Sequence, residues 1–128
     1  GEEMHAALQS LSETGIQCAA ITSGIGRVRD IRIGYLDGEG VYQTREYADS
    51  MELLSTQGNL APGPDGPFSH IHVVLSDDDH VVQGGHLFHA TVHVTAELHL
   101  RVLDSGSEAM RRESTASEFM ALSFCAVE

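Results

Sequence analysis

Three histidines carry the clearest chemical signal in the chain. His70 and His72 are separated by a single residue, and His86 follows fourteen residues after His72. Side chains on a β-strand alternate between its two faces, so a strand here places the imidazoles of His70 and His72 on one face, about 7 Å apart at the backbone. Ile71 then points to the opposite face, into the core. Two imidazoles arranged in this way can chelate a first-row transition metal.

A third ligand is expected from the neighbouring strand. The acidic run at residues 77–79 predicts a turn, so the chain after it returns antiparallel and carries His86 back toward the pair. Gly84 and Gly85 permit a bulge or a close backbone approach just before this histidine. Three imidazoles with an open position are typical of a catalytic zinc site rather than a closed structural one. Neutral imidazole also suits nickel, copper, cobalt or iron, which leaves the identity of the divalent transition metal open.

The pair can also be explained without a metal, as polar residues on a solvated face. We expect the other five histidines to be exposed on a helix, in a turn or on the wet face of a sheet: His5, His80, His89, His93 and His99. Glu97 stands in the middle of a long apolar segment. Its carboxylate could orient a ligand histidine from the second coordination sphere, or it could be an ordinary surface group.

A sheet must position these residues, and the hydrophobic pattern predicts one. Met4, Leu8 and Leu11 recur at helical spacing, which predicts an amphipathic helix over residues 2–14 that ends at Gly15. After it the period changes to two, which predicts strands over residues 17–22, 28–36, 41–46, 51–60, 68–76, 81–88, 91–103 and 119–127. The proline-containing stretch 61–67 is expected to be a loop, residues 104–107 a turn, and residues 108–118 are ambiguous. The fold class is α+β, with one main helix against a central, mostly antiparallel sheet in a single domain over residues 1–128.

The segment 91–103 is the most regular of these strands. Its apolar side chains alternate with polar ones, so one face is expected to carry Val92, Val94, Ala96, Leu98, Leu100 and Val102. The opposite face then carries His93, Glu97 and His99.

Composition excludes several classes of protein. The chain has 128 residues, with 7 basic and 19 acidic ones and a net charge of −12, and every basic residue is arginine. Binding to duplex DNA or to an anionic membrane surface requires clustered Lys and Arg, so neither is expected without another basic segment. No apolar run approaches the roughly 20 residues of a membrane span, and the acidic start is unlike a signal peptide. Cys18 and Cys125 are too few for a disulfide scaffold, so we expect reduced thiols in a cytoplasmic protein.

Five short motifs follow one another along the chain. They are Ser23-Gly24-Ile25-Gly26, then Glu52-Leu53-Leu54-Ser55 with Gly58-Asn59, then Ser69-His70-Ile71-His72 running to Leu75-Ser76, then Gly84-Gly85-His86-Leu87 and Thr95-Ala96-Glu97. In this order and spacing they resemble the plant and prokaryote conserved (PPC) domain family, in its stand-alone prokaryotic form. The resemblance covers nearly the whole chain.

The resemblance implies a compact domain around an antiparallel sheet, assembled as a homotrimer. It also implies that His70, His72 and His86 are metal ligands, with zinc as the expected metal. Family members are commonly labelled as candidate DNA-binding proteins, a label that derives from plant AT-hooks which this sequence lacks. The family usually has a strand before its first helix, whereas this sequence starts at the helix.

Three hypotheses from different classes of function follow. The chain could be a homotrimeric metal-binding domain that binds or transforms an unknown small ligand. It could be a DNA-associated regulatory protein, although its charge disfavours direct contact with phosphates. It could also be an assembly scaffold in which the histidines only stabilise the structure.

Overall fold

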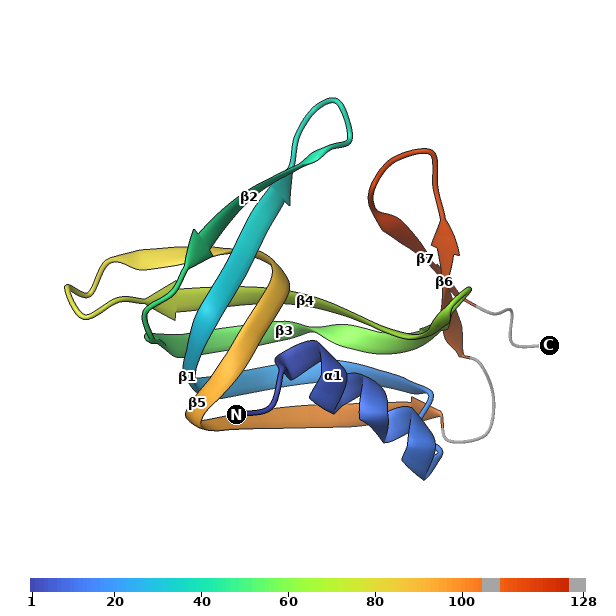
Figure 1. The fold of residues 1–128 in the computed structure, drawn as a ribbon. Helices are drawn as coiled ribbons and strands as arrows, with labels where there is room; N and C mark the ends of the chain where they lie inside the picture. Colours follow the sequence, from blue (N-terminus) through green and yellow to red (C-terminus); the bar gives the residue numbers. More distant parts are fainter. Residues whose placement is uncertain (105–108, 125–128) are drawn as a thin grey trace.

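The computed structural model describes residues 1–104 and 109–124 and confirms the α+β class (Figure 1). Within these residues one short helix, continued by a 3₁₀ turn, packs against a mostly antiparallel sheet, and a two-stranded sheet follows. The elements in chain order are α1 (Met4–Gln9), η1 (Ser10–Thr14), β1 (Cys18–Leu36), β2 (Tyr42–Tyr47), β3 (Met51–Gly63), β4 (Gly66–Ser76), β5 (Val82–Asp104), β6 (Met110–Ser114) and β7 (Met120–Phe124). None of the helices in the described residues is long and apolar enough to span a bilayer.

The predicted helix is present but changes character halfway. The Glu3 carboxylate caps it by accepting from the Ala6 amide at 2.8 Å, and the following turns tighten into a 3₁₀ helix that ends at Gly15 with φ 91°. Hydroxyl groups explain the tightening, because Ser10 and Ser12 donate to backbone carbonyls three residues back and so compete with regular helical bonding.

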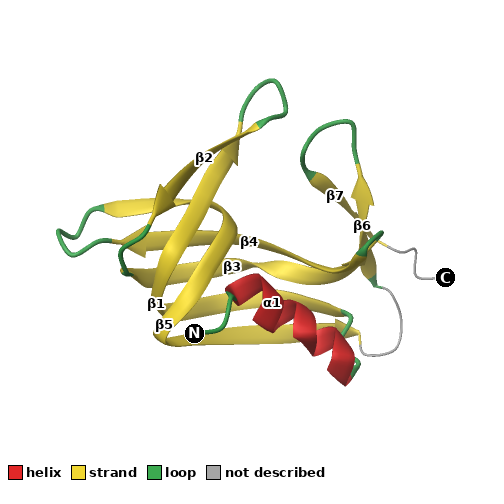
Figure 2. Cartoon of the chain, viewed as in Figure 1, coloured by secondary structure: helices red, strands yellow, loops and turns green. Residues whose placement is uncertain are grey.

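The main sheet closes on itself. Its strand order is β2-β1-β3-β4-β5, and β5 pairs with β1 as well as with β4. The core lies on the side where α1, β1, β3, β4 and β5 all contribute apolar side chains, and Figure 2 shows α1 lying across the sheet there.

The sequence predicted two pairs of separate strands that are single strands in the structure. Residues 17–22 and 28–36 belong to the single strand β1, and residues 81–88 and 91–103 belong to the single strand β5. The glycines near residue 25 suggested the first break, but they serve close strand approach instead. Gly26 lies opposite Ala96, and a Cβ there would collide with the Thr95 carbonyl.

The regular alternation predicted for 91–103 is also interrupted. Gly26 pairs with Ala96 and Val28 pairs with Val92, so β5 holds three residues where β1 holds one, which is a β-bulge. Val94 lies in this bulge with φ 74° and is 85% exposed. The predicted apolar face is therefore only partly covered, since Val102 is 44% exposed as well.

The prediction of a loop over residues 61–67 is wrong. β3 runs to Gly63 and β4 begins at Gly66, so a tight turn joins them, with Pro62 paired to Pro67 one step before the end of the ladder. Prolines are tolerated at such terminal positions because their missing N–H is not needed there.

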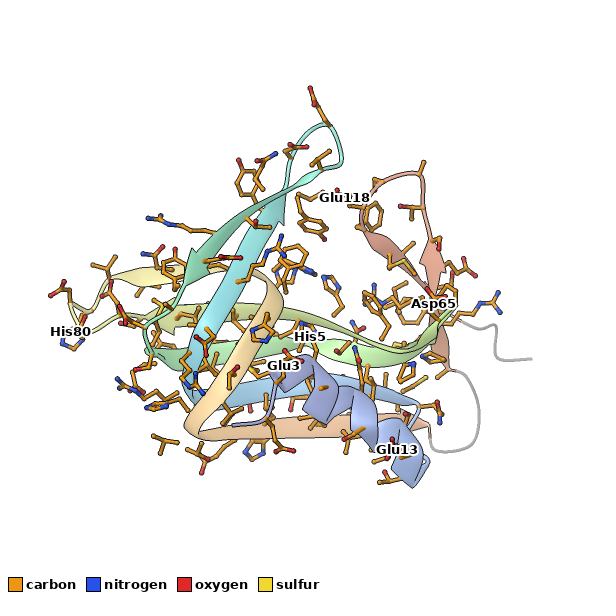
Figure 3. All side chains as sticks on the ribbon, in the orientation of Figure 1. Glu3, His5, Glu13, Asp65, His80 and Glu118 are labelled. Atoms are coloured by element: carbon orange, nitrogen blue, oxygen red, sulfur yellow. The ribbon has the colours of Figure 1, made fainter. Side chains whose placement is uncertain are left out.

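The stretch that the sequence left ambiguous contains β6, which forms a hairpin with β7. β7 begins at Met120, within the strand predicted over residues 119–127. The hairpin docks on the sheet through Cys18, Ala61 and Met110, which form a second small core. Its turn reaches the β1–β2 hairpin, where the Glu118 amide donates to the Gly40 carbonyl at 3.2 Å; Figure 3 shows Glu118 beside that hairpin. Most of the turn predicted at 104–107 and the end of the strand predicted to 127, with Cys125, lie outside the described residues.

Candidate metal centre

The register of β4 and β5 brings the three predicted histidines together. On β4, Ile71 and Val73 are buried, which turns His70 and His72 to the opposite face as expected. His86 on β5 pairs directly with His72 across the ladder. Residues directly opposite on an antiparallel pair share a face, so all three imidazoles project to the same side.

The two glycines before His86 allow the neighbouring strands to approach β5 closely. The β4–β5 ladder runs past them without a register shift. A Cβ on Gly84 would lie 2.7 Å from the Val73 carbonyl oxygen, and one on Gly85 would lie 2.7 Å from the Gly34 carbonyl oxygen. Of the two alternatives, close approach is confirmed, and it lets β5 pass tightly between β4 and β1 with His86 at the crossing.

The distances within the cluster suit a metal ion. One potential ligand nitrogen from each histidine lies within 4.8 Å of the other two, and the Nε2 atoms of His70 and His72 are 3.2 Å apart. Two imidazole nitrogens on one tetrahedral zinc are separated by about 3.3 Å, from a Zn–N distance of about 2.05 Å. The pair therefore fits coordination without a change in its spacing.

The electrostatics of the cluster keep two of the rings neutral. Burial lowers the pKa of His70 to about 4, with further contributions from the positive charge of Arg112 and from His72 and His5. Burial also lowers the pKa of His86 to about 4, with neighbouring histidines adding to the effect. A metal binds only the neutral imidazole, so at pH 7 both rings have the charge state that coordination requires.

These pKa values predict an acid-dependent loss of stability in the metal-free protein. Between pH 6.5 and about 4 the unfolded chain takes up protons on His70 and His86, whereas the folded chain does not. The free energy of unfolding should therefore fall as the pH falls through this window. Urea unfolding at pH 7 and pH 5 measures it, and a His70→Gln/His86→Gln variant should lose less stability than the natural chain; equal losses would contradict the assignment.

His86 has the environment of a ligand rather than of a surface residue. Its Nδ1 atom is buried and has no hydrogen-bond partner. Tyr42 stacks on the ring with centroids 4.8 Å apart, and Phe88 meets it edge-on at 4.7 Å. A cation among the three rings would offset the cost of burying polar nitrogens without partners, so the residues present fit a metal ion.

Arg112 on β6 contacts the histidine cluster, which the sequence did not indicate. Its guanidinium is buried, and Nη2 donates to Asn59 Oδ1 at 2.5 Å and to His70 Nδ1 at 3.3 Å. Because arginine only donates, Nδ1 of His70 must accept, and the ring carries its proton on Nε2. Asn59 could have been noticed, since it belongs to a family motif and pairs with His70 in the β3–β4 ladder.

Replacing Arg112 should strengthen metal binding. A metal on His70 Nε2 would move the ring proton to Nδ1, which faces the Arg112 donor, so the arginine favours the metal-free tautomer. Arg112→Met removes the donor that opposes a proton on His70 Nδ1, and it also removes a positive charge. The zinc dissociation constant should therefore fall by roughly tenfold, which is the size of the smaller effects that outer-sphere residues have on metal affinity. Competition with a chelator measures it, with Arg111→Met as the control because Arg111 is exposed and paired to Glu113; weaker zinc binding by Arg112→Met would show that the arginine instead holds His70 in place.

The three histidines line a cavity of about 810 Å³. Its walls are mostly apolar and come from α1, the β1–β2 hairpin, β4, β5 and the turn between β6 and β7. Cavities of this size and character hold small molecules.

The other sequence candidates lie elsewhere or differ from expectation. Glu97 is exposed and pairs with Ile25, whereas His86 pairs with Gly34, so the structure does not bring Glu97 to the histidines.

The expectation that His5 is exposed is wrong. It is half-buried at the cavity, where Nδ1 accepts from the Ser69 hydroxyl at 2.6 Å and Nε2 donates to the Leu87 carbonyl at 2.9 Å. Its position three residues before the buried Leu8 was a usable signal, because the two share a helix face. As expected, the remaining four histidines are exposed: His80, His89, His93 and His99.

Comparison with known proteins decides the family. The sequence model of the Plants and Prokaryotes Conserved (PCC) domain, the family also written PPC, matches residues 1–104. The chain belongs to the PCC domain family. The β6–β7 hairpin, which supplies Arg112 to the site of this PCC domain, lies outside the matched range.

Solved structures similar to this PCC domain agree with the assignment. A PPC protein from Pyrococcus horikoshii is 31% identical, with 99% of this chain and 87% of that chain covered and a TM-score of 0.86. A metal-containing protein from Archaeoglobus fulgidus is 35% identical, with 100% and 87% covered and a TM-score of 0.78. A candidate DNA-binding protein from Ralstonia eutropha shares the fold at 22% identity, with 98% and 86% covered and a TM-score of 0.83. No curated protein sequence matches the chain.

Proposed function

We propose that this PCC domain binds a divalent transition metal, with zinc as the first candidate, through His70, His72 and His86. The observation that carries the proposal is that one nitrogen of each ring lies within 4.8 Å of the other two, beside a cavity. The metal content of the 35% identical relative from Archaeoglobus fulgidus supports it.

The ligand set favours a site that is open to a small molecule. Among the described residues, no fourth His, Cys, Asp or Glu joins the three histidines. Structural zinc sites use four protein ligands, whereas three leave a position free. When bound, the metal would supply a positive charge and a coordination position for that molecule. The chain's own residues keep the rings of His70 and His86 neutral, and Tyr42 and Phe88 pack against the ring of His86.

Zinc titration of the whole protein tests the proposal. After removal of metals by a chelator, the protein should take up one zinc per chain, as measured by elemental analysis and chelator competition. Zinc at 100 times its dissociation constant should also raise the free energy of unfolding by about 2.7 kcal/mol. Substoichiometric uptake with no change in unfolding would refute the metal site.

We also infer that the domain assembles as a homotrimer. Support comes from the uncovered apolar side chains on β5, where Val94 and Val102 are exposed, and from Ile25 on the paired strand, which is 55% exposed. Exposed apolar patches mark interaction surfaces. Native mass spectrometry tests the stoichiometry, and a trimer that forms equally well without any zinc uptake would favour the scaffold hypothesis.

Direct DNA binding is less well supported by the charge distribution. Four of the seven arginines lie within ion-pair distance of a carboxylate: Arg27, Arg29, Arg32 and Arg111. Arg112 is buried. Binding to phosphates needs free clustered cations, so electrophoretic shifts at physiological salt should show no complex with duplex DNA.

A cytoplasmic location remains our expectation, consistent with the buried, unpaired Cys18 thiol.

A further inference from the structure

The walls of the cavity are suited to an apolar, aromatic body. Aromatic side chains contribute from four elements and from the β6–β7 turn: Tyr35, Tyr42, Phe68, Phe88 and Phe119. Two of these rings are open to solvent, Tyr35 at 65% and Phe119 at 41%. Exposed apolar patches mark interaction sites and ligand-binding grooves, and aromatic faces favour a ring as the partner.

Away from the three histidines, several polar groups of the cavity already bond to one another. Ser69 donates to His5 and accepts from Gln9 Nε2 at 3.2 Å, and His5 donates to the Leu87 carbonyl. Glu118 accepts from the Tyr42 amide at 2.7 Å. A sugar or a nucleotide would leave many of its polar groups against apolar walls without partners, which is unfavourable.

The charge at the histidine wall favours an anion. A divalent cation on three neutral imidazoles would place two positive charges there, and the Arg112 guanidinium stands only one imidazole ring away, 3.3 Å from His70 Nδ1. The one carboxylate among the lining residues, Glu118, comes from the turn between β6 and β7 and accepts from the Tyr42 amide. An anionic group on the occupant would therefore go to the metal.

We propose that the cavity binds a small aromatic monocarboxylate, with the carboxylate at the open metal position and the ring against the aromatic side chains that include Tyr35 and Phe119. The inference rests on the proposed metal site. It extends that site by assigning the class of ligand.

Three matched probes test the inference on protein whose zinc content has first been measured. Benzoate has both the ring and the carboxylate, acetate has only the carboxylate, and benzyl alcohol has only the ring. By calorimetry, zinc-loaded protein should bind benzoate about tenfold tighter than either of the other two, and about tenfold tighter than zinc-free protein does, from the combined contributions of ring contacts and charge.

A pair of phenylalanine variants locates the binding. Phe119→Ser should weaken benzoate binding about tenfold and leave zinc binding unchanged. Phe124→Ser should change neither, because Phe124 is 75% exposed and does not line the cavity.

The outcomes separate the two proposals. If the protein binds no zinc, the metal site fails and this inference falls with it. If zinc binds but benzoate binds no tighter than acetate, the inference alone is overturned; a cavity filled by a second copy of the chain would give that result. An unchanged benzoate affinity in Phe119→Ser would also overturn it.

Discussion

His72→Ala should reduce zinc affinity by about 100-fold or more without unfolding the protein. Structural zinc sites gain about 10–16 kcal/mol from four ligands, or roughly 3 kcal/mol per ligand, and 1.4 kcal/mol is a factor of ten. His72 is the most suitable of the three for this test because its side chain is exposed, whereas His70 and His86 are partly buried. Its removal therefore costs little packing, and a loss of zinc reports coordination directly.

The matched control for this variant is His93→Ala. His93 is also an exposed histidine on the main sheet, but it lies in the β5 bulge and does not belong to the metal group. In chelator competition, His93→Ala should bind zinc with the same affinity as the natural chain. If both alanine variants retained the affinity of the natural chain, zinc would bind elsewhere and His72 would not be a ligand.

Gly58→Ala should destabilise the fold by about 1–3 kcal/mol, the usual cost of forcing extra atoms into a packed region. Gly58 on β3 pairs with Ile71 on β4, and a Cβ there would collide with the carbonyl oxygen of His70. The neighbour is backbone rather than a flexible side chain, so β4 itself must shift. Because His70 is carried on that backbone, zinc affinity should fall in the same variant.

Gly38→Ala provides the control for this substitution. Gly38 is in the turn between β1 and β2, and a Cβ there would meet no atom within 4 Å. Surface substitutions of this kind usually stay within about 0.5 kcal/mol. Denaturant unfolding of the two variants side by side should show the difference, and a Gly58→Ala protein as stable as Gly38→Ala would mean that β3 and β4 are less closely packed than described.

The part of the site that follows the two-residue period was predictable from sequence. Alternation on β4 separates His70 and His72 from Ile71, and the turn after Ser76 sets the register that pairs His72 with His86. These are local relations, fixed by strand geometry and by a hairpin.

The contacts made by elements distant in the sequence were not predictable in the same way. Arg112 reaches His70 from 42 residues away, and His5 reaches Leu87 from 82 residues away. Neither contact depends on a local period; each depends on how the sheet closes and where the β6–β7 hairpin docks. Gly24 and Gly26 caused the false break predicted within β1, because close strand approach and chain reversal require the same small residue.

A crystal structure of the zinc-loaded protein, with zinc located by its anomalous scattering, would show which residues bind the metal. We expect one zinc per chain, bound by His70, His72 and His86, with the fourth position held by water or a small ligand. Zinc bound at other residues, or a fourth protein ligand closing the site, would contradict this expectation.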